Sequence, residues 1–92
     1  MRARSRKQIA VYIARRKLVA ALLTENPWCS IRWDDRCEGA ATEVDERMSR
    51  AAGGSILDPD NCQVTCRWCH QQKHANPAQA VARGFTIQRR SA

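Results

Sequence analysis

The sequence contains few aromatic side chains from which a small protein could build a core. Three Trp, one Tyr and one Phe are spread over 92 residues. A chain of this length has room for one compact domain and buries too little apolar surface to be very stable by packing alone. Five of the residues are Cys, which indicates a structural metal, a disulfide framework or ordinary buried thiols.

Long apolar runs are missing as well. Arg15, Arg16 and Lys17 interrupt the apolar residues that follow the basic N-terminus, so no signal peptide is expected, and no stretch approaches the length of a membrane span. We therefore expect a cytoplasmic protein that has no contact with a membrane. Because that compartment is reducing, clustered thiols favour metal binding over disulfides, and the odd number of Cys residues also argues against complete pairing.

Acidic residues are absent from the N-terminal part of the chain. Seven Lys and Arg lie within residues 1–17, whereas all nine acidic residues lie between Glu25 and Asp60. The net charge of +7 favours a polyanionic partner such as nucleic acid. A basic segment that contacts only solvent is the alternative.

This basic N-terminal part has the pattern of a helix. Apolar residues recur at three- and four-residue spacing between residues 7 and 24, which predicts an amphipathic basic helix that ends near Asn26-Pro27. The apolar residues are Ile9, Tyr12, Ile13, Ala20 and Leu23. The helix could lie along a phosphate backbone or cover the core. Three of its cations are candidate DNA contacts, namely Arg15, Arg16 and Lys17.

The remaining elements are short and predict an α+β fold. We expect two strands and two helices, at 42–46, 63–65, 66–75 and 77–83. Asn76-Pro77 has the form of an N-cap followed by proline at the first helical position. Gly53-Gly54 predicts a loop, and Asp58-Pro59-Asp60-Asn61 predicts a turn. The expected organisation is a helix at 1–24, a domain at 25–84 and a loose basic tail at 85–92.

Four of the cysteines have the spacing of a zinc site. Cys66 and Cys69 form a C-x-x-C step, and Cys29 and Cys37 supply a second pair about 30 residues upstream. A structural zinc held by these four cysteines is the leading interpretation, and it would help so short a chain to fold. The alternative is two buried thiols plus a redox C-x-x-C, although the βαβ context of a redox motif is missing.

The fifth cysteine and the tryptophans have less specific roles. Cys62 occupies a strand position where we expect a small core side chain. Trp28, Trp33 and Trp68 each lie within four residues of a zinc cysteine. We expect them to pack around the metal, with stacking on bases as the alternative.

Several polar residues remain after the zinc site is assigned. Asp45-Glu46 lies on a predicted strand, while His70 and His74 are four residues apart and so share one face of a predicted helix. A strand carboxylate and a helix imidazole could bind one divalent cation and leave positions open for water and a phosphate oxygen. Taken singly, each residue has an ordinary alternative, either a solvated strand end or a spare zinc ligand.

Residues 28–84 resemble the HNH endonuclease family, also called ββα-metal or His-Me finger nucleases. The resemblance depends on Val44-Asp45-Glu46, Gly53-Gly54, Asn61 and Cys66-x-x-Cys69-His70-x-x-Lys73. The family pattern has V-D-H, six residues, G-G, a short D-x-x-N turn and C-x-x-C-H-x-x-K. Here the spacing of six residues is kept, and His70 follows Asn61 by nine positions.

The resemblance implies a ββα-metal core with a separate structural zinc held by the four cysteines. Asp45 and His70 would hold one catalytic ion, which could be Mg²⁺, Mn²⁺, Ni²⁺ or Zn²⁺, and His74 is a candidate third ligand. Asn61 would tether the loop so that the catalytic base is oriented. The expected phosphate contacts outside the N-terminal helix are Arg47, Arg50 and Lys73.

Glu46 is the departure from the family pattern, because it stands where the family has its general-base histidine. Glutamate has a reference pKa of about 4.3 against about 6.5 for histidine, so it should be the weaker base. Slower cleavage, a shifted pH optimum or reliance on a partner would follow. Glu46 could instead bind the ion directly, or the chain could have lost activity and kept DNA binding.

The sequence thus predicts a metal-dependent DNA endonuclease that hydrolyses phosphodiester bonds. Small proteins with this pattern resemble those encoded by phages and prophages, some of which act beside the packaging terminase, and such a protein would work in the host cytoplasm. One alternative is an HNH-fold zinc protein that serves as a DNA-binding or phage-assembly module. Another is a structural zinc domain that contacts a protein through its N-terminal helix, although the strong positive charge counts against it.

Overall fold

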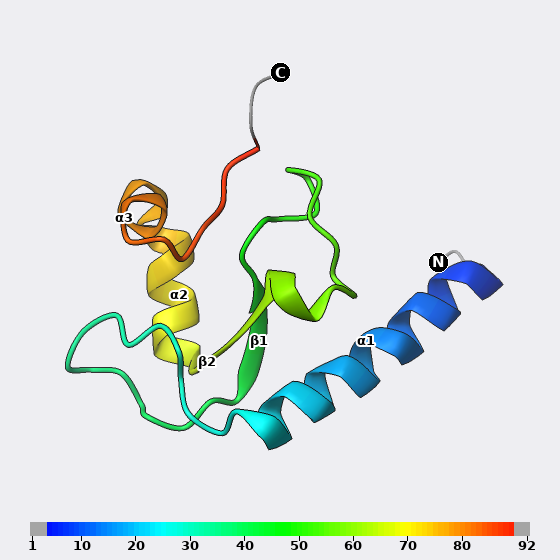
Figure 1. Ribbon diagram of the computed structural model, residues 1–92, viewed down its shortest axis with the longest axis horizontal. Helices are drawn as coiled ribbons and strands as arrows, with labels where there is room; N and C mark the ends of the chain where they lie inside the picture. The colour runs from blue at the N-terminus through cyan, green and yellow to red at the C-terminus, as the bar shows by residue number, and fades with distance from the viewer. Residues whose placement is uncertain (1–3, 90–92) are drawn as a thin grey trace.

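The structure is a computed structural model that describes residues 4–89. The first three residues of the expected helix and residues 90–92 of the expected tail lie outside the described residues. The elements follow one another as a long helix, a strand, a 3-10 turn, a second strand and two short helices. This order confirms the predicted small α+β fold, with two antiparallel strands followed by a helix (Figure 1).

Helix α1 (Arg6–Glu25) begins at a capping box. The backbone N–H of Gln8 donates to Ser5 Oγ at 3.2 Å, and the N–H of Ser5 donates to Gln8 Oε1 at 2.9 Å. The helix ends at Asn26, directly before Pro27, as the sequence predicts.

The apolar face predicted for α1 is wrong at four of its five residues and correct at Leu23, which is partly buried. Ile9, Tyr12 and Ile13 are 47%, 52% and 51% exposed. The helix packs against strand β1 and presents a different stripe of partly buried residues, which includes Val11, Arg15, Leu18, Val19 and Leu22. In Figure 1 the N-terminal half of α1 projects past the rest of the molecule. The apolar side chains of Ile9, Tyr12 and Ile13 on this half are therefore left exposed.

Strands β1 (Glu43–Glu46) and β2 (Cys62–Thr65) pair with Asp45 opposite Gln63. Each differs from the predicted strand by one residue at its start. Successive side chains of a strand point to opposite faces. Accordingly Asp45 contacts Lys73 of helix α2 (Arg67–Ala75), whereas Glu46 lies next to Arg15 of α1. The two acidic side chains therefore have partners on different helices.

The 3-10 turn η1 (Pro59–Asn61) and helices α2 (Arg67–Ala75) and α3 (Pro77–Ala82) complete the fold. Cys66 is the N-cap of α2, and its sulfur accepts the N–H of Cys69 at 3.4 Å. Asn76 holds the N-cap position of α3 but makes no side-chain cap. Its amide donates instead to the carbonyl of Gln72 at 2.9 Å, so the predicted capping bond is absent.

The prediction of a loose tail is wrong for residues 85–87. The carbonyl of Phe85 accepts a hydrogen bond from Gln63 Nε2 at 2.9 Å, and the N–H of Ile87 donates to the carbonyl of Arg47 at 2.7 Å. Gly84, with a φ of 81°, permits the turn that leads the chain from α3 back to the strands. These bonds hold the segment beside the end of β1.

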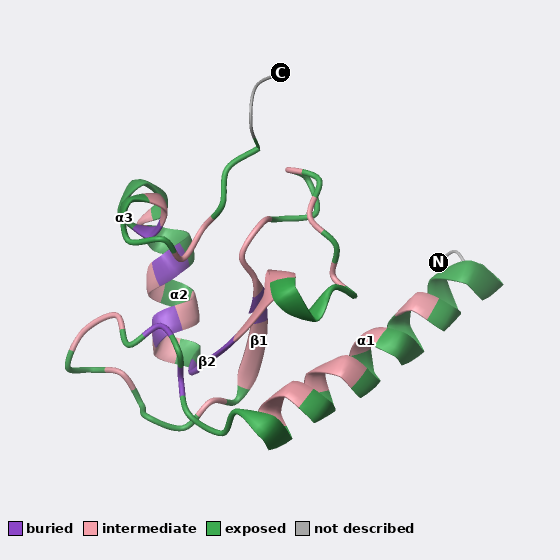
Figure 2. Ribbon diagram, viewed as in Figure 1, coloured by how far each residue is buried: buried purple, intermediate pink, exposed green. Residues whose placement is uncertain are grey.

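Buried side chains gather around sulfur rather than around a conventional apolar core. Cys29, Cys66 and Cys69 are at most 1% exposed and cluster with Ile31 (Figure 2). Partly buried aromatic side chains pack against them, and these are Trp33, Trp68 and Phe85. Trp28 is 65% exposed, so its expected packing around the metal is wrong. Within residues 4–89, no helix combines the length and hydropathy needed to cross a bilayer.

Candidate functional site

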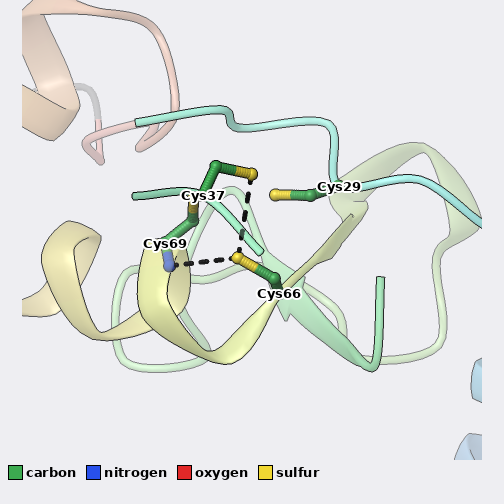
Figure 3. Close-up of side chains that lie close together, drawn as sticks. All are labelled: Cys29, Cys37, Cys66 and Cys69. Atoms are coloured by element: carbon green, nitrogen blue, oxygen red, sulfur yellow. Dashed lines mark hydrogen bonds between the residues drawn. The ribbon is translucent and has the colours of Figure 1, made fainter. Parts of the chain in front are cut away.

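The four predicted zinc cysteines come together in the structure. The sulfur atoms of Cys29, Cys37, Cys66 and Cys69 all lie within 4.8 Å of one another (Figure 3). Cys37 Sγ and Cys66 Sγ are 3.9 Å apart. Zinc–sulfur bonds of about 2.3 Å in a tetrahedron place the sulfurs about 3.8 Å apart. The cluster therefore fits a tetrahedral ion of zinc size, and Cys62 lies outside it.

Backbone donors surround these sulfurs. The N–H groups of Trp33 and Glu38 point to Cys69 Sγ at 3.3 Å and to Cys66 Sγ at 3.4 Å. Burial opposes ionisation of Cys29, but hydrogen bonds from the backbone of Arg32, Cys66 and Ile31 and from the side chain of Thr65 outweigh it and lower its pKa to about 6. Thiolates are the form that binds zinc.

Burial and the neighbouring thiols raise the pKa of Cys69, and burial also raises the pKa of Cys37. Cys37 and Cys69 therefore resist ionisation as free thiols. A bound dication would remove that resistance, so the donor set fits a metal better than it fits four free thiols.

A second group of metal-ligating atoms joins α2 to strand β1. Asp45, His70 and His74 offer donor atoms within 4.8 Å of one another. Nε2 of each histidine lies 3.3 Å from Asp45 Oδ1. The two rings come from successive turns of α2, and their centroids are 4.8 Å apart. The residues that the sequence predicts as the catalytic ligands are thus adjacent, with room for one ion between them.

Hydrogen bonds fix the orientation of these ligands. Burial would raise the pKa of Asp45, but bonds from His70, Lys73 and Gln63 outweigh it and hold that pKa well below its usual range. Bonds to Asp45 and then to Glu43, against the opposing effect of burial, raise the pKa of His70 to about 9. Glu43 Oε1 lies 2.6 Å from His70 Nδ1, which leaves Nε2 directed at Asp45.

Lys73 lies beneath this cluster. Its side chain is 5% exposed, and its ammonium donates to Asp45 Oδ2 and, at 2.8 Å, to the carbonyl of Glu46. This placement differs from the expected phosphate contact. Lys73 neutralises one oxygen of Asp45 and leaves Oδ1 to the two histidines.

Glu46 is not a member of the ligand group but lines the adjoining cavity. Its Oε2 lies 3.7 Å from Arg15 Nη2, and both side chains are mostly buried. The Arg15 guanidinium also donates to the carbonyl of Ile56 at 2.7 Å and to Cys62 Sγ at 3.2 Å. Arg15 therefore points into the domain, toward Glu46, while Arg16 and Lys17 remain exposed.

Asn61 ties down the loop that follows β1. Its Oδ1 accepts the N–H of Met48 at 2.8 Å, and its Nδ2 donates to the carbonyls of Met48 and Ser55 at 2.9 and 3.0 Å. Gly54 lies so close that a Cβ atom there would overlap the Met48 carbonyl oxygen. The Gly-Gly step of the sequence pattern therefore permits the close approach that these bonds need.

A cavity of about 270 Å³, called here the site cavity, opens beside Asp45 and Glu46. Arg47 and Arg50, both expected phosphate contacts, line it together with His74. Arg47 Nη2 donates to the carbonyl of Gly84 at 3.2 Å, whereas Arg50 is exposed. Acidic residues, the histidine His74 and basic residues thus line one space large enough for a phosphate group and water.

A family model described as HNH endonuclease matches residues 29–76, more than half of the chain. The chain belongs to the HNH endonuclease family. The match spans both strands, the loop held by Asn61 and helix α2, and it stops before α3. An HNH endonuclease domain indicates nuclease activity in general and DNA as the substrate. No curated protein and no solved structure matches the chain.

Sequence reasoning missed the residues that orient the ligands. Glu43 stands two positions before Asp45, so the alternation of a strand puts both on one face, and this signal was present in the sequence. Gln63 opposes Asp45 only through the register of the sheet, which the sequence does not specify. The inward direction of Arg15 depends on how α1 packs on the domain, and no local pattern marks it.

Proposed function

We propose that this HNH protein is a metal-dependent DNA endonuclease that hydrolyses phosphodiester bonds at the Asp45–His70–His74 cluster. The observation that carries the proposal is the convergence of those three donors, two of which, Asp45 and His74, line the site cavity together with Glu46. The arrangement leaves coordination positions open toward the cavity, as catalytic metal sites do. The proposed structural ion is zinc, held by the four cysteines.

In this proposal each side chain has a separate task. A bound divalent ion supplies Lewis-acid stabilisation of charge on the phosphate and on the leaving oxygen. Asp45, His70 and His74 hold that ion, and Lys73 and Glu43 hold the ligands in place. Arg47 and Arg50 attract and position the DNA backbone without reading its sequence.

Glu46 acts as the general base. Its carboxylate takes a proton from water as the water oxygen bonds to phosphorus, and the bond from phosphorus to the 3′ oxygen breaks. The proton ends on the 3′ oxygen, which yields a 3′ hydroxyl and a 5′ phosphate. Arg15 holds the Glu46 carboxylate in place, with its Nη2 3.7 Å from Glu46 Oε2.

The competing function is a DNA-binding module that kept the fold without the chemistry. The contact of Glu46 with Arg15 favours it, because that carboxylate is already engaged by a cation. A role beside a phage terminase, and a place in the host cytoplasm, stay predictions that rest on the resemblance to phage and prophage proteins.

Plasmid nicking tests the proposal. Zinc-loaded protein would be incubated with supercoiled plasmid and Mg²⁺, Mn²⁺ or Ni²⁺, alongside His70→Ala, Glu46→His and the control Gln71→Ala, which changes an exposed residue of the same helix. We expect metal-dependent nicking that His70→Ala abolishes, Gln71→Ala retains and Glu46→His increases. DNA binding without nicking under any ion would favour the binding module.

A further inference from the structure

A second cavity lies outside the cluster of ligands. It has a volume of about 390 Å³ and is formed by the projecting half of α1 and the loop that carries Arg50 and Ile56. Arg4, Lys7 and Arg15 line it from α1 and the residues just before it. Within residues 4–89, every charged side chain that lines this space is basic. We call it the α1 groove.

Three of these cations are available to a ligand. Arg15 is engaged by Glu46 and by backbone carbonyls, but Arg4, Lys7 and Arg50 form no ion pair in the described part of the chain. Arg4 lies over the Tyr12 ring, 4.0 Å from its centroid, and donates to the Tyr12 hydroxyl at 3.3 Å. The ring therefore holds one guanidinium at the groove before any ligand arrives.

The α1 groove adjoins the site cavity, because Arg50 lines both spaces. A chain of phosphates that enters the site cavity can therefore continue past Arg50 toward Lys7 and Arg4. The apolar parts of Val11, Tyr12 and Ile56 form the rest of the wall, where deoxyribose could pack.

We propose that the α1 groove binds the phosphodiester backbone of the DNA whose scissile phosphate occupies the site cavity. The proposal rests on the proposed function for its substrate. It assigns the contacts of α1 to Arg4 and Lys7 and leaves the outward cations of the helix outside the interface. Charge complementarity favours DNA over an apolar or basic protein partner, since each phosphate neutralised releases counterions.

A matched pair of double variants tests this assignment. Arg4→Gln/Lys7→Gln removes two charges from the groove. Arg6→Gln/Arg89→Gln is the control and removes two exposed charges that do not line the groove. Arg6 precedes Lys7 by one residue, so its side chain points about 100° away from that of Lys7 around the helix axis. Binding of the zinc-loaded full chain to a fluorescein-labelled duplex of about 20 base pairs, two helical turns, would be followed by anisotropy at several salt concentrations.

We expect the groove variant to bind roughly tenfold or more weakly and the slope of log affinity against log salt to fall by about 2, whereas the control changes little. Arg4→Lys/Lys7→Arg should restore binding. In nicking assays the groove variant should raise KM and leave kcat unchanged. Equal losses in both double variants, with unchanged thermal melting, would overturn the groove assignment alone. A wild-type protein that binds no DNA would overturn the proposed function instead.

Discussion

The sulfur cluster and the histidine cluster lie on the same short helix, yet the protein encloses them very differently. Cys29, Cys66 and Cys69 are at most 1% exposed, whereas the side chain of His74 is 62% exposed and lies beside a cavity. Four protein donors close the first site, and three donors leave the second open. Closed tetrahedral sites are typical of structural zinc, and open ones are typical of catalytic ions.

This difference follows from where each ligand stands in the chain. The cysteines join a loop near residue 29 to the start of α2, so a bound ion would connect segments that lie far apart in the sequence. Asp45 and the histidines come from β1 and α2, which the sheet and Lys73 already hold together. The first site should therefore determine whether the chain folds, and the second should determine what it does.

The largest expected effect is on folding, and it comes from the closed site. Cys69→Ser should abolish cooperative unfolding and zinc retention, because the metal-binding free energy is part of the folding free energy. Circular dichroism melts and the zinc content of the purified protein measure both. Cys62→Ser is the matched control and should keep a wild-type melt, since a serine hydroxyl can still accept from Arg15. A Cys69→Ser protein with a wild-type melt would contradict a structural role for the cluster.

A substitution of Lys73 tests whether this residue holds Asp45 in place before an ion binds. Lys73→Met leaves Asp45 buried without its cation, and the loss of one partner of such a pair costs about 3 kcal/mol. Urea denaturation should show that loss in zinc-loaded protein. Added Mn²⁺ should restore part of the stability if it binds at Asp45, and it should do so less in Lys73→Met/His70→Ala. An unchanged midpoint for Lys73→Met would show that the ammonium does not support Asp45.

A substitution of Arg15 distinguishes two roles for its charge, which are positioning Glu46 and attracting DNA. Arg15→Gln should lower kcat for nicking by about tenfold, a modest part of what general-base catalysis supplies, and change KM little. Arg6→Gln on the outer face of the same helix is the control for lost charge. In a double-mutant cycle with Glu46→Gln the two effects should not add, because they report one ion pair. Additive effects would assign Arg15 a purely structural role.

The smallest expected effect is on the start of α1. Ser5→Ala removes one bond of the capping box and should cost about 1 kcal/mol of local helix stability. Faster amide hydrogen exchange in the first turns of α1, with unchanged exchange in α2, would show it. Exchange that also rises in α2 would mean that the two parts of the molecule are more tightly coupled than the packing suggests.

Much of the site could be predicted because short-range patterns encode it. The C-x-x-C step, the histidines on one helical face and the Asp-Glu pair on a strand depend on local geometry. The structure brings the cysteines together and places Asp45 beside the two histidines, whereas Glu46 lies next to Arg15. The end of α1 at Asn26 could also be predicted, because it depends only on the proline that follows.

Other features depend on contacts between distant segments, and sequence patterns missed them. The buried face of α1 is set by β1, so the spacing of Ile9, Tyr12 and Ile13 indicated the wrong side. The sequence predicts that Lys73 contacts phosphate at the surface, whereas in the structure Lys73 is buried and paired with Asp45 of strand β1. The segment 85–87 looked loose because its partners, Gln63 and Arg47, lie far away in the sequence.

Measuring nicking and metal content on the same samples tests most directly whether a second ion, separate from the zinc, drives DNA cleavage. Zinc-loaded protein would be titrated with Mn²⁺, and plasmid nicking would be recorded against the occupancy of the second ion while the zinc content is monitored. We expect one retained zinc per chain and a nicking rate that rises in proportion to a second ion that His70→Ala fails to bind. Full occupancy of the second site without nicking, or nicking that is independent of it, would contradict catalysis by an ion at Asp45, His70 and His74.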